Sequence, residues 1–315
     1  MKREICHSIR VGREQNLRRW IGAHVPVNTK STYAGYQRQF VEFCATERLP
    51  LDSPVAVAEF LRFGLEVKKW SRSTLNNVAA SAIADMHRFE RYHPTSDPLV
   101  KATKKVITSC TEASKGKIPL PTRYLERMAR SALPTEKEIR DVFLFIIMFG
   151  GLLRESEAVA LEFSDVWISK DELEGECLYV FIQKSKTDQQ RRGDTVVLAA
   201  CPGSCLCPVE WFRLHCGVRR SNTHVFHSTF SVPAQLSVKR PNGLLKEWLE
   251  KMEVPNVDVY GSHSLRKGGA TAAAAARVQI HVLKRHGRWR SDAVYIYIVD
   301  PLNQRLEVSR AVLGA

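Results

Sequence analysis

A polar segment at residues 109–121 divides the sequence into two parts and limits what either part can fold into. It reads SCTEASKGKIPLP and ends with two prolines, which cannot continue a helix. Small polar residues followed by prolines are typical of a linker between folded units. At 315 residues the chain has room for two domains of ordinary size. We therefore predict a domain at 1–108, a linker at 109–121 and a second domain at 122–315.

The first part is dominated by helical periodicity. Tyr33, Tyr36, Phe40 and Phe43 recur at three- or four-residue intervals, which places them on one face of a helix. A serine followed by a proline is a typical beginning of the next helix. Helices are predicted at 32–45, at 54–63, from 73 to the His-Pro break at 93–94, and at 99–107. The first domain is therefore predicted to be an all-helical bundle.

The second part mixes helices with short β-type runs. Cys177–Gln183 and Thr195–Leu198 flank a polar segment, which predicts a hairpin. Helices are predicted at 122–131, 136–153, 208–214, 243–252, 265–277 and 280–286, and from a more ambiguous pattern at 292–299. The predicted fold is therefore mainly α with a small antiparallel β-sheet.

The charge balance indicates an anionic partner. Lysine and arginine outnumber aspartate and glutamate by 47 to 33, which leaves a formal net charge of +14. These basic residues are spread over both halves of the chain, as expected of a surface that contacts nucleic acid. The longest nearly uncharged apolar run, Val142–Leu153, has 12 residues, short of the roughly 20 that a membrane helix needs. We see no secretory signal, and we expect an intracellular protein without a membrane partner.

No motif for metal or nucleotide chemistry is evident. A group of cysteines with one histidine suggests zinc, but it lacks the paired C-x2-C spacing of structural sites, so zinc is the less favoured interpretation. The group comprises Cys201, Cys205, Cys207, His215 and Cys216. Phosphate-binding loops, H-E-x-x-H and paired acidic clusters are absent from the sequence. We therefore predict neither a metal nor a cofactor.

Four segments of the second part carry cations, and a tyrosine follows the last of them. They read GGLLRESE at 150–157, QKSKTD at 183–188, HSLR at 263–266 and HGRWRS at 286–291. Glycines and alanines follow HSLR, so that helix can pack closely and hold its first turn deep in a cleft. Each segment alone has an ordinary explanation, such as an exposed charge or a core aromatic. Together they offer what phosphodiester transfer without a metal requires.

In this order the motifs resemble those of the tyrosine recombinase, or phage integrase, family. Its pattern runs G-L-R-x-S-E, a hairpin lysine, H-x-x-R, G-H or G-R-W, and a tyrosine, and the resemblance covers nearly the whole chain. It implies that the catalytic residues are Arg154, Lys186, His263, Arg266, Trp289 and Tyr297. Glu157 would be the supporting carboxylate. Since histidine precedes the glycine here, Arg288 and His286 stay open as alternatives to Trp289.

The resemblance implies a site-specific recombinase that cuts and rejoins double-stranded DNA through a 3′-phosphotyrosyl bond. The helical first part would be its core-binding domain, and the enzyme would act as a homotetramer on DNA. The eight-residue step from Trp289 favours Tyr297 over Tyr295 as the nucleophile. A domesticated protein that binds DNA without cutting it and a type IB topoisomerase are the alternatives.

The G-R-W form of the fourth motif also bears on the host and on localisation. With the Ser-Asp-Ala that follows, it looks closest to eukaryotic transposon-type members such as those of crypton or DIRS-like elements. That resemblance would place the protein in the nucleus, and otherwise in the cytoplasm or nucleoid.

Overall fold

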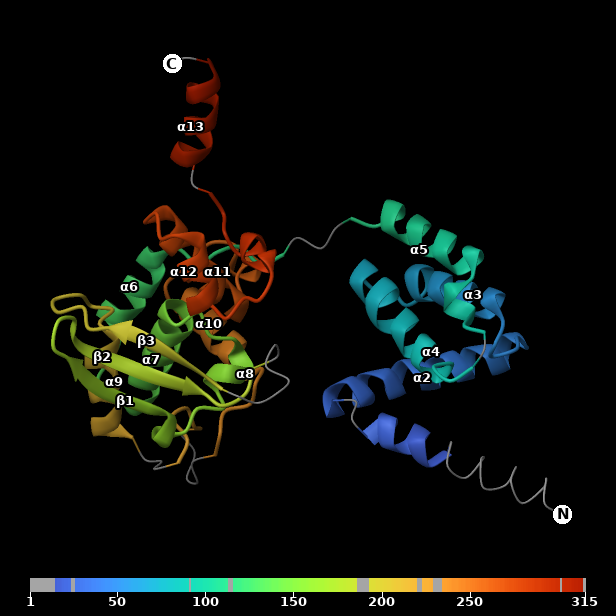
Figure 1. Ribbon diagram of the computed structural model, residues 1–315, viewed down its shortest axis with the longest axis horizontal. Helices are drawn as coiled ribbons and strands as arrows, with labels where there is room; N and C mark the ends of the chain where they lie inside the picture. Colours follow the sequence, from blue (N-terminus) through green and yellow to red (C-terminus); the bar gives the residue numbers. More distant parts are fainter. Residues whose placement is uncertain are drawn as a thin grey trace. The chain divides into compact units, whose positions relative to one another are not determined.

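The chain divides into two compact units in the computed structural model, Met1–Lys115 and Gly116–Ala315. Figure 1 colours the first from blue to green and the second from green to red. The residues described are 15–23, 26–90, 92–112, 116–185, 193–219, 223–228, 234–300 and 302–313. The boundary between the units lies inside the segment 109–121.

The described part of the first unit is helical. Its elements are α2 (Val27–Glu47), α3 (Pro54–Glu66), the π-helical turn η1 (Thr74–Ala79), α4 (Ala80–Met86), the 3-10 turn η2 (Pro94–Ser96) and α5 (Pro98–Cys110). Phe40 and Phe60 are fully buried and meet edge to face, with ring centres 5.2 Å apart. Asp97 caps α5 by accepting a hydrogen bond from the Leu99 amide. The prediction of a helical first domain is confirmed for these residues.

The second unit surrounds one long buried helix. Its helices are α6 (Thr122–Ser131), α7 (Glu136–Gly150), α8 (Glu155–Ala158), α9 (Pro208–Val218), α10 (Arg240–Lys251), α11 (Ser262–Ala275), α12 (Ile280–His286) and α13 (Leu302–Leu313), with 3-10 turns η3 (Phe163–Asp165), η4 (Val257–Val259) and η5 (Asp292–Ile296). Thr135 caps α7 by accepting a hydrogen bond from the Glu138 amide. Every residue of α7 from Ile139 to Met148 is buried, so this helix forms the centre of the core.

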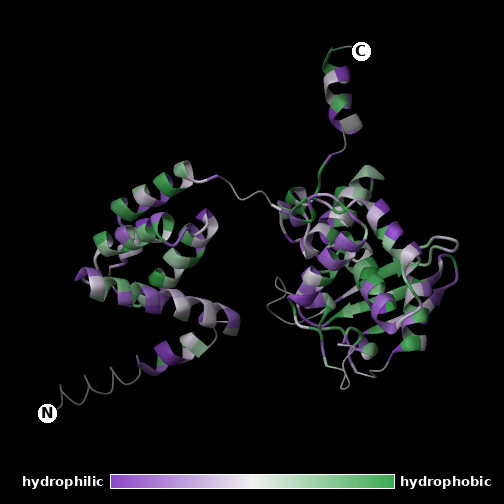
Figure 2. Ribbon diagram, turned by 180° about the vertical axis from the view of Figure 1, so that it is seen from behind, coloured by the Kyte–Doolittle hydropathy of each residue, from purple (hydrophilic) through white to green (hydrophobic). Residues whose placement is uncertain are grey.

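A three-stranded antiparallel sheet completes the second unit. Its strands β1 (Val166–Asp171), β2 (Gly175–Ile182) and β3 (Asp194–Ala199) lie in sequence order. Figure 2 shows hydrophobic residues along these strands. The predicted hairpin is the β2–β3 pair, so the prediction of a small antiparallel sheet is confirmed. Strand β1 was not predicted, because only Val166 of its six residues is buried and the apolar alternation is weak.

Two helix predictions were wrong, one at the first motif and one after the last. The helix predicted to reach residue 153 ends at Gly150, because Leu152 takes a left-handed backbone conformation with φ of 50°. The helix predicted at 292–299 is only the 3-10 turn η5, which Ser291 caps by accepting a hydrogen bond from the Ala293 amide. Both differences lie at turns that aim side chains of the candidate site.

Two glycines bring α11 against the end of α7. A Cβ atom at Gly269 would overlap the backbone carbonyl of Phe149, and one at Gly268 would overlap the carbonyl of Leu120. Any larger residue would therefore push the helices apart. The predicted close packing of this helix is confirmed, and it holds the first turn of α11 beside the residues that follow α7.

None of the described helices is both long enough and apolar enough to cross a membrane.

Candidate active site

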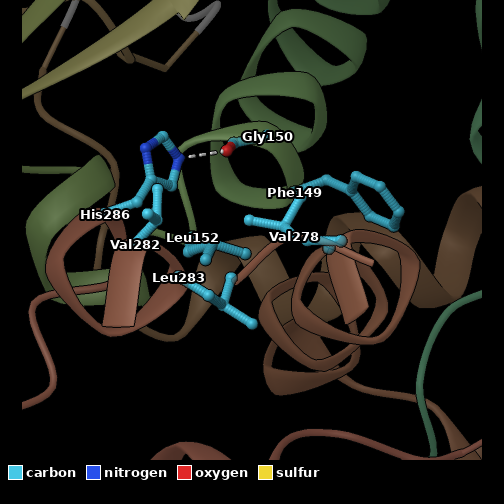
Figure 3. Close-up of a pocket in the computed structure, with 9 residues that line it drawn as sticks. Phe149, Gly150, Leu152, Val278, Val282, Leu283 and His286 are labelled. Atoms are coloured by element: carbon cyan, nitrogen blue, oxygen red, sulfur yellow. Dashed lines mark hydrogen bonds between the residues drawn. The ribbon is translucent and has the colours of Figure 1, made fainter. Parts of the chain in front are cut away.

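Successive backbone carbonyl groups at the end of α7 bind basic side chains from the last part of the chain. His286 Nε2 lies 2.8 Å from the Gly150 oxygen (Figure 3). Arg288 donates to the oxygens of Gly151 at 3.3 Å and Leu152 at 3.1 Å, and Arg266 also donates to Leu152. The C-terminal end of a helix presents carbonyl oxygens and a partial negative charge, so it favours cations.

Arg266 is fully buried at the centre of this cluster. Its Nη2 donates to the Gly287 oxygen at 2.6 Å, and its Nε is buried without a partner among the described residues. Burial, reinforced by the nearby charges of Arg154 and Arg288, lowers its pKa to about 10. Arg266 therefore remains a cation at neutral pH, held in a site that water does not reach.

Glu157 connects two of the arginines. Its Oε1 accepts from Arg154 Nη1 at 2.5 Å, and its Oε2 accepts from the Arg154 amide and from Arg288 Nη2, both at 2.9 Å. Burial alone would raise the pKa of this carboxyl, but the charges of Arg288 and Arg154 and the hydrogen bonds to it hold the pKa below its usual value. Glu157 is therefore ionised at neutral pH.

Arg154 is the most accessible of the three arginines. Its side chain is 16% exposed, whereas that of Arg288 is 4% exposed and Arg266 is fully buried. It precedes α8 in an extended conformation, with its side chain hydrogen bonded to Glu157. An approaching anion can therefore reach Arg154 before the other two.

Trp289 and Tyr297 cover the buried arginine. The guanidinium carbon of Arg266 lies 4.3 Å from the Trp289 ring centre and 5.4 Å from that of Tyr297, and the two rings are 5.1 Å apart. Trp289 Nε1 is buried without a partner among the described residues. Thr271 fixes the chain beyond η5, because its hydroxyl donates to the Tyr297 carbonyl and accepts from the Val299 amide, both at 3.2 Å.

The structure thus brings together four of the six predicted catalytic residues: Arg154, Arg266, Trp289 and Tyr297. His263 lies on the first turn of α11, one turn before Arg266, and is exposed. Lys186 lies outside the described residues, between the end of β2 and the start of β3. Of the alternatives to Trp289, His286 contacts the Gly150 carbonyl and Arg288 contacts Glu157.

Sequence reasoning missed the part played by the backbone of α7. Carbonyl groups of Gly150, Gly151 and Leu152 carry no sequence signal, because every residue has one. Thr271 was also missed, since it lies among glycines and alanines on a helix predicted only for close packing. The positive φ at Leu152 that aims these carbonyls could not be read from a leucine.

An apolar cavity of about 280 Å³ lies next to this cluster (Figure 3). It is lined by Phe149, Gly150, Leu152, Gly269, Ala273, Val278, Val282, Leu283 and His286. Its walls come from α7, α11 and α12, the helices that hold the arginines in place. His286 is the one polar side chain among these lining residues.

The cysteines do not form a metal centre in the described part of the chain. No group of three or more His, Cys, Asp or Glu side chains is placed there to hold a metal ion. His215, one member of the suggested zinc group, lies within 2.7 Å of the Val225 oxygen, and burial lowers its pKa to about 4. It is therefore a neutral core residue.

The sequence is similar to that of one described recombinase. An integrase/recombinase xerD homolog from Selenomonas ruminantium is 24% identical over 287 residues, which cover 86% of this chain and 81% of that protein. No family model matches the chain.

Solved structures of several DNA complexes share the fold. The Tn1549 transposon integrase with transposon right end DNA has a TM-score of 0.60 at 14% identity, covering 93% of this chain and 95% of that one. XerH recombinase bound to palindromic difH substrate has a TM-score of 0.62 at 19% identity, covering 90% and 80%. A lambda integrase dimer bound to a core site has a TM-score of 0.60 at 14% identity, covering 91% and 76%.

Proposed function

We propose that this chain, which resembles tyrosine recombinases in sequence and fold, is one of them and cuts and rejoins DNA strands through Tyr297. One observation carries the assignment of the residues. The Tyr297 and Trp289 rings both lie against the buried Arg266 guanidinium, and Arg154, which is hydrogen bonded to Glu157, is close enough for its charge to act on Arg266. A nucleophile next to two guanidinium groups suits attack on a phosphodiester.

The reaction follows from the properties of these groups. The Tyr297 oxygen attacks the phosphorus, a tyrosyl–phosphate bond forms, and the bond to the 5′ oxygen breaks. Arg154 and Arg266 bind the non-bridging oxygens as charge builds on them, and the free Trp289 Nε1–H is available for another hydrogen bond. His263 assists removal of the tyrosine proton, and Lys186 gives a proton to the departing 5′ oxygen.

Rejoining is the reverse of cutting. The 3′-phosphotyrosyl bond conserves the energy of the broken phosphodiester, so a 5′ hydroxyl from another strand can attack it and release Tyr297. Neither step needs ATP or a metal, and the proposed reaction uses no cofactor.

A covalent adduct is the direct test of this function. The protein is mixed with a nicked DNA duplex whose cleaved 5′ fragment diffuses away, which prevents rejoining. We expect a protein–DNA species that survives denaturation. It should carry a label placed on the strand whose 3′ phosphate becomes joined to the tyrosine. DNA binding without any adduct would favour the domesticated alternative, and relaxation of supercoiled DNA without strand exchange would favour the topoisomerase.

Double-stranded DNA is the proposed partner of both units. The net charge of +14 is spread along the whole chain, and the solved neighbours are described in complex with DNA. The helical first unit is the proposed core-binding domain and the second the catalytic domain. The protein would then act on genomic DNA, in the nucleus if the host is a eukaryote and in the cytoplasm or nucleoid otherwise.

Binding should weaken steeply as salt is raised. Each neutralised phosphate releases condensed counterions, so a protein with six or more phosphate contacts loses about a thousandfold in affinity between low and moderate salt. Fluorescence anisotropy with a labelled duplex measures this, and circular dichroism at each salt concentration controls for unfolding. A flat response would contradict a charge-dominated interface.

Strand exchange between two duplexes needs four cleavages, so we propose a homotetramer on DNA with α13 as the exchanged element. Val312 and Leu313 on α13 are 77% and 80% exposed, which leaves apolar surface for a second copy of the chain. The apolar cavity beside the arginine cluster is a suitable receiving site for such side chains.

Deletion of residues 302–315 should therefore abolish tetramers on DNA and leave binding of a single copy largely intact. Mass photometry of the DNA complexes measures the number of copies. Leu173→Ser is a matched control, because Leu173 is 94% exposed at another site and should not alter assembly. Unchanged tetramers after the deletion would contradict the exchange of α13 between copies and would favour its packing against its own chain.

A further inference from the structure

We propose that Arg288 is a positioning residue of the strand-transfer site, which fixes the Glu157 carboxylate and through it the guanidinium of Arg154. The inference rests on the proposed function and adds a third arginine to it. It assigns Arg288 a task different from that of its neighbour Trp289.

The contacts of Arg288 are directed at protein groups. Its Nη1 donates to the oxygens of Gly151 at 3.3 Å and His286 at 3.1 Å. Its Nη2 donates to the oxygen of Leu152 at 3.1 Å and to Glu157 Oε2 at 2.9 Å. Both terminal nitrogens are thus engaged, and the side chain is only 4% exposed. Arg288 therefore ties the loop after α7 to α8.

Glu157 passes this constraint on to Arg154. One carboxylate oxygen, Oε2, binds both Arg288 Nη2 and the Arg154 amide, and the other, Oε1, binds the Arg154 guanidinium. The carboxylate therefore fixes both the backbone and the side chain of Arg154. If Arg288 is lost, Oε2 loses one of its donors and the Arg154 side chain loses its fixed direction.

The turn after α12 separates the tasks of Arg288 and Trp289. Arg288 has a φ of 58°, and a Cβ atom at Gly287 would overlap the Trp289 ring. This tight turn sends Arg288 to Glu157 and Trp289 to the face of Arg266. The two adjacent residues therefore have different partners: Arg288 binds Glu157, and the Trp289 ring lies against Arg266 and Tyr297.

Charge explains why Glu157 needs Arg288. The carboxylate side chain is 1% exposed, so burial opposes its ionisation, and Arg288 is the strongest of the charges that counter it. The charged or titratable groups around this pair are Arg154, Glu155 on α8, Arg266 on α11 and Tyr297 beside Arg266, with Asp194 on β3 facing Arg288. Without Arg288 the pKa of Glu157 rises, and the carboxyl takes up a proton as the pH falls.

The test is the pH profile of single-turnover adduct formation on the nicked duplex, with four variants. Arg288→Met should slow cleavage about a hundredfold at neutral pH and add a loss of rate on the acid side. Arg288→Lys keeps the charge and should recover part of the rate. Glu157→Gln and the double variant should be slow without the new acid-side loss, because glutamine does not titrate.

Control variants and folding measurements keep the outcomes separate. Arg213→Met removes an arginine that is salt-bridged to Glu176 and Glu210 outside the site, and it should cleave as the wild type does. Thermal melting reports whether each variant folds. If Arg288→Met does not fold, Arg288→Lys and Glu157→Gln still decide the matter through their rates and pH profiles.

Three results would overturn the inference. The first is that Arg288→Met cleaves with the rate and pH profile of the wild type. If Arg288→Met does not fold, the corresponding result is a wild-type rate and pH profile in both Arg288→Lys and Glu157→Gln. The second is an acid-side loss that persists in the double variant. In both cases the wild type still forms its adduct, so the proposed function stands. If the wild type forms no adduct, the proposed function fails and this positioning role fails with it.

Discussion

Replacing Tyr297 with phenylalanine should eliminate the covalent protein–DNA adduct while folding and DNA affinity stay nearly unchanged. The substitution removes one oxygen atom and keeps the ring that packs 5.1 Å from Trp289 and 5.4 Å from the Arg266 guanidinium. The structure therefore loses little, whereas the reaction loses its nucleophile. Denaturing gel electrophoresis with labelled nicked DNA measures the adduct, and anisotropy measures the affinity.

Tyr295→Phe is the matched control for this experiment. Tyr295 is 59% exposed, and it lies in the 3-10 turn η5, where residues two apart point about 240° from each other. It therefore cannot share the direction of Tyr297, and its variant should form the adduct normally. The assignment is wrong if the adduct persists in Tyr297→Phe and disappears in Tyr295→Phe.

Substitution of either phosphate-binding arginine should also abolish cleavage, with only a modest loss of DNA affinity. In the proposed function Arg154 and Arg266 each make one of many contacts to the DNA backbone, and both bind the phosphate that reacts. Loss of one preorganised donor of this kind typically slows a reaction by about 10² to 10³, and loss of its charge adds to that. Arg154→Ala is the cleaner variant, because Arg154 is partly exposed and Arg266 fills a buried site.

Arg266→Lys tests geometry apart from charge. A lysine ammonium cannot bind the Leu152 and Gly287 carbonyls as the planar guanidinium does and still offer a donor to a phosphate. We therefore expect the lysine variant to fail as well, with thermal melting to confirm that it folds. Near-normal cleavage by this variant would contradict the proposed role.

In the wild-type protein the positive charge of Arg266 should support cleavage at every pH near neutrality. The pKa of this group is lowered to about 10, and a base with a lowered pKa loses its charge as the pH rises. A decline in cleavage caused by Arg266 therefore belongs to strongly alkaline solution, near pH 10. The rate of adduct formation by the wild type, measured from neutral pH to above pH 10, tests this.

The order of the chemical motifs and the general class of the fold could be predicted, because both depend on local pattern. The helical spacing of aromatic residues in α2 and the β-type runs of β2 and β3 can each be recognised from a short stretch of sequence. The close packing of α11 was also predictable. Adjacent glycines destabilise a helix, so their presence in one indicates that another part of the chain approaches closely there. These features need no knowledge of what lies opposite.

The parts that could not be predicted depend on partners distant in the sequence. β1 is stabilised by pairing with β2 and exposes most of its side chains, so its pattern is poor. α7 stops at Gly150 because the chain turns at Leu152, which has a positive φ. The Leu152 carbonyl oxygen then accepts hydrogen bonds from Arg266 and Arg288. The task of Arg288 likewise depends on Glu157, 131 residues earlier, which no local reading connects to it.

That distance has a consequence for the time at which the protein becomes active. Glu157 and the end of α7 are synthesised well before Arg266, Arg288 and Tyr297, and the contact from Leu152 to Arg266 alone spans 114 residues. A ribosome-bound chain therefore carries an unfinished site until its last segments have emerged. If the proposed function holds, the chain cannot cut DNA during its own translation, and a product terminated before α11 lacks both Arg266 and Tyr297.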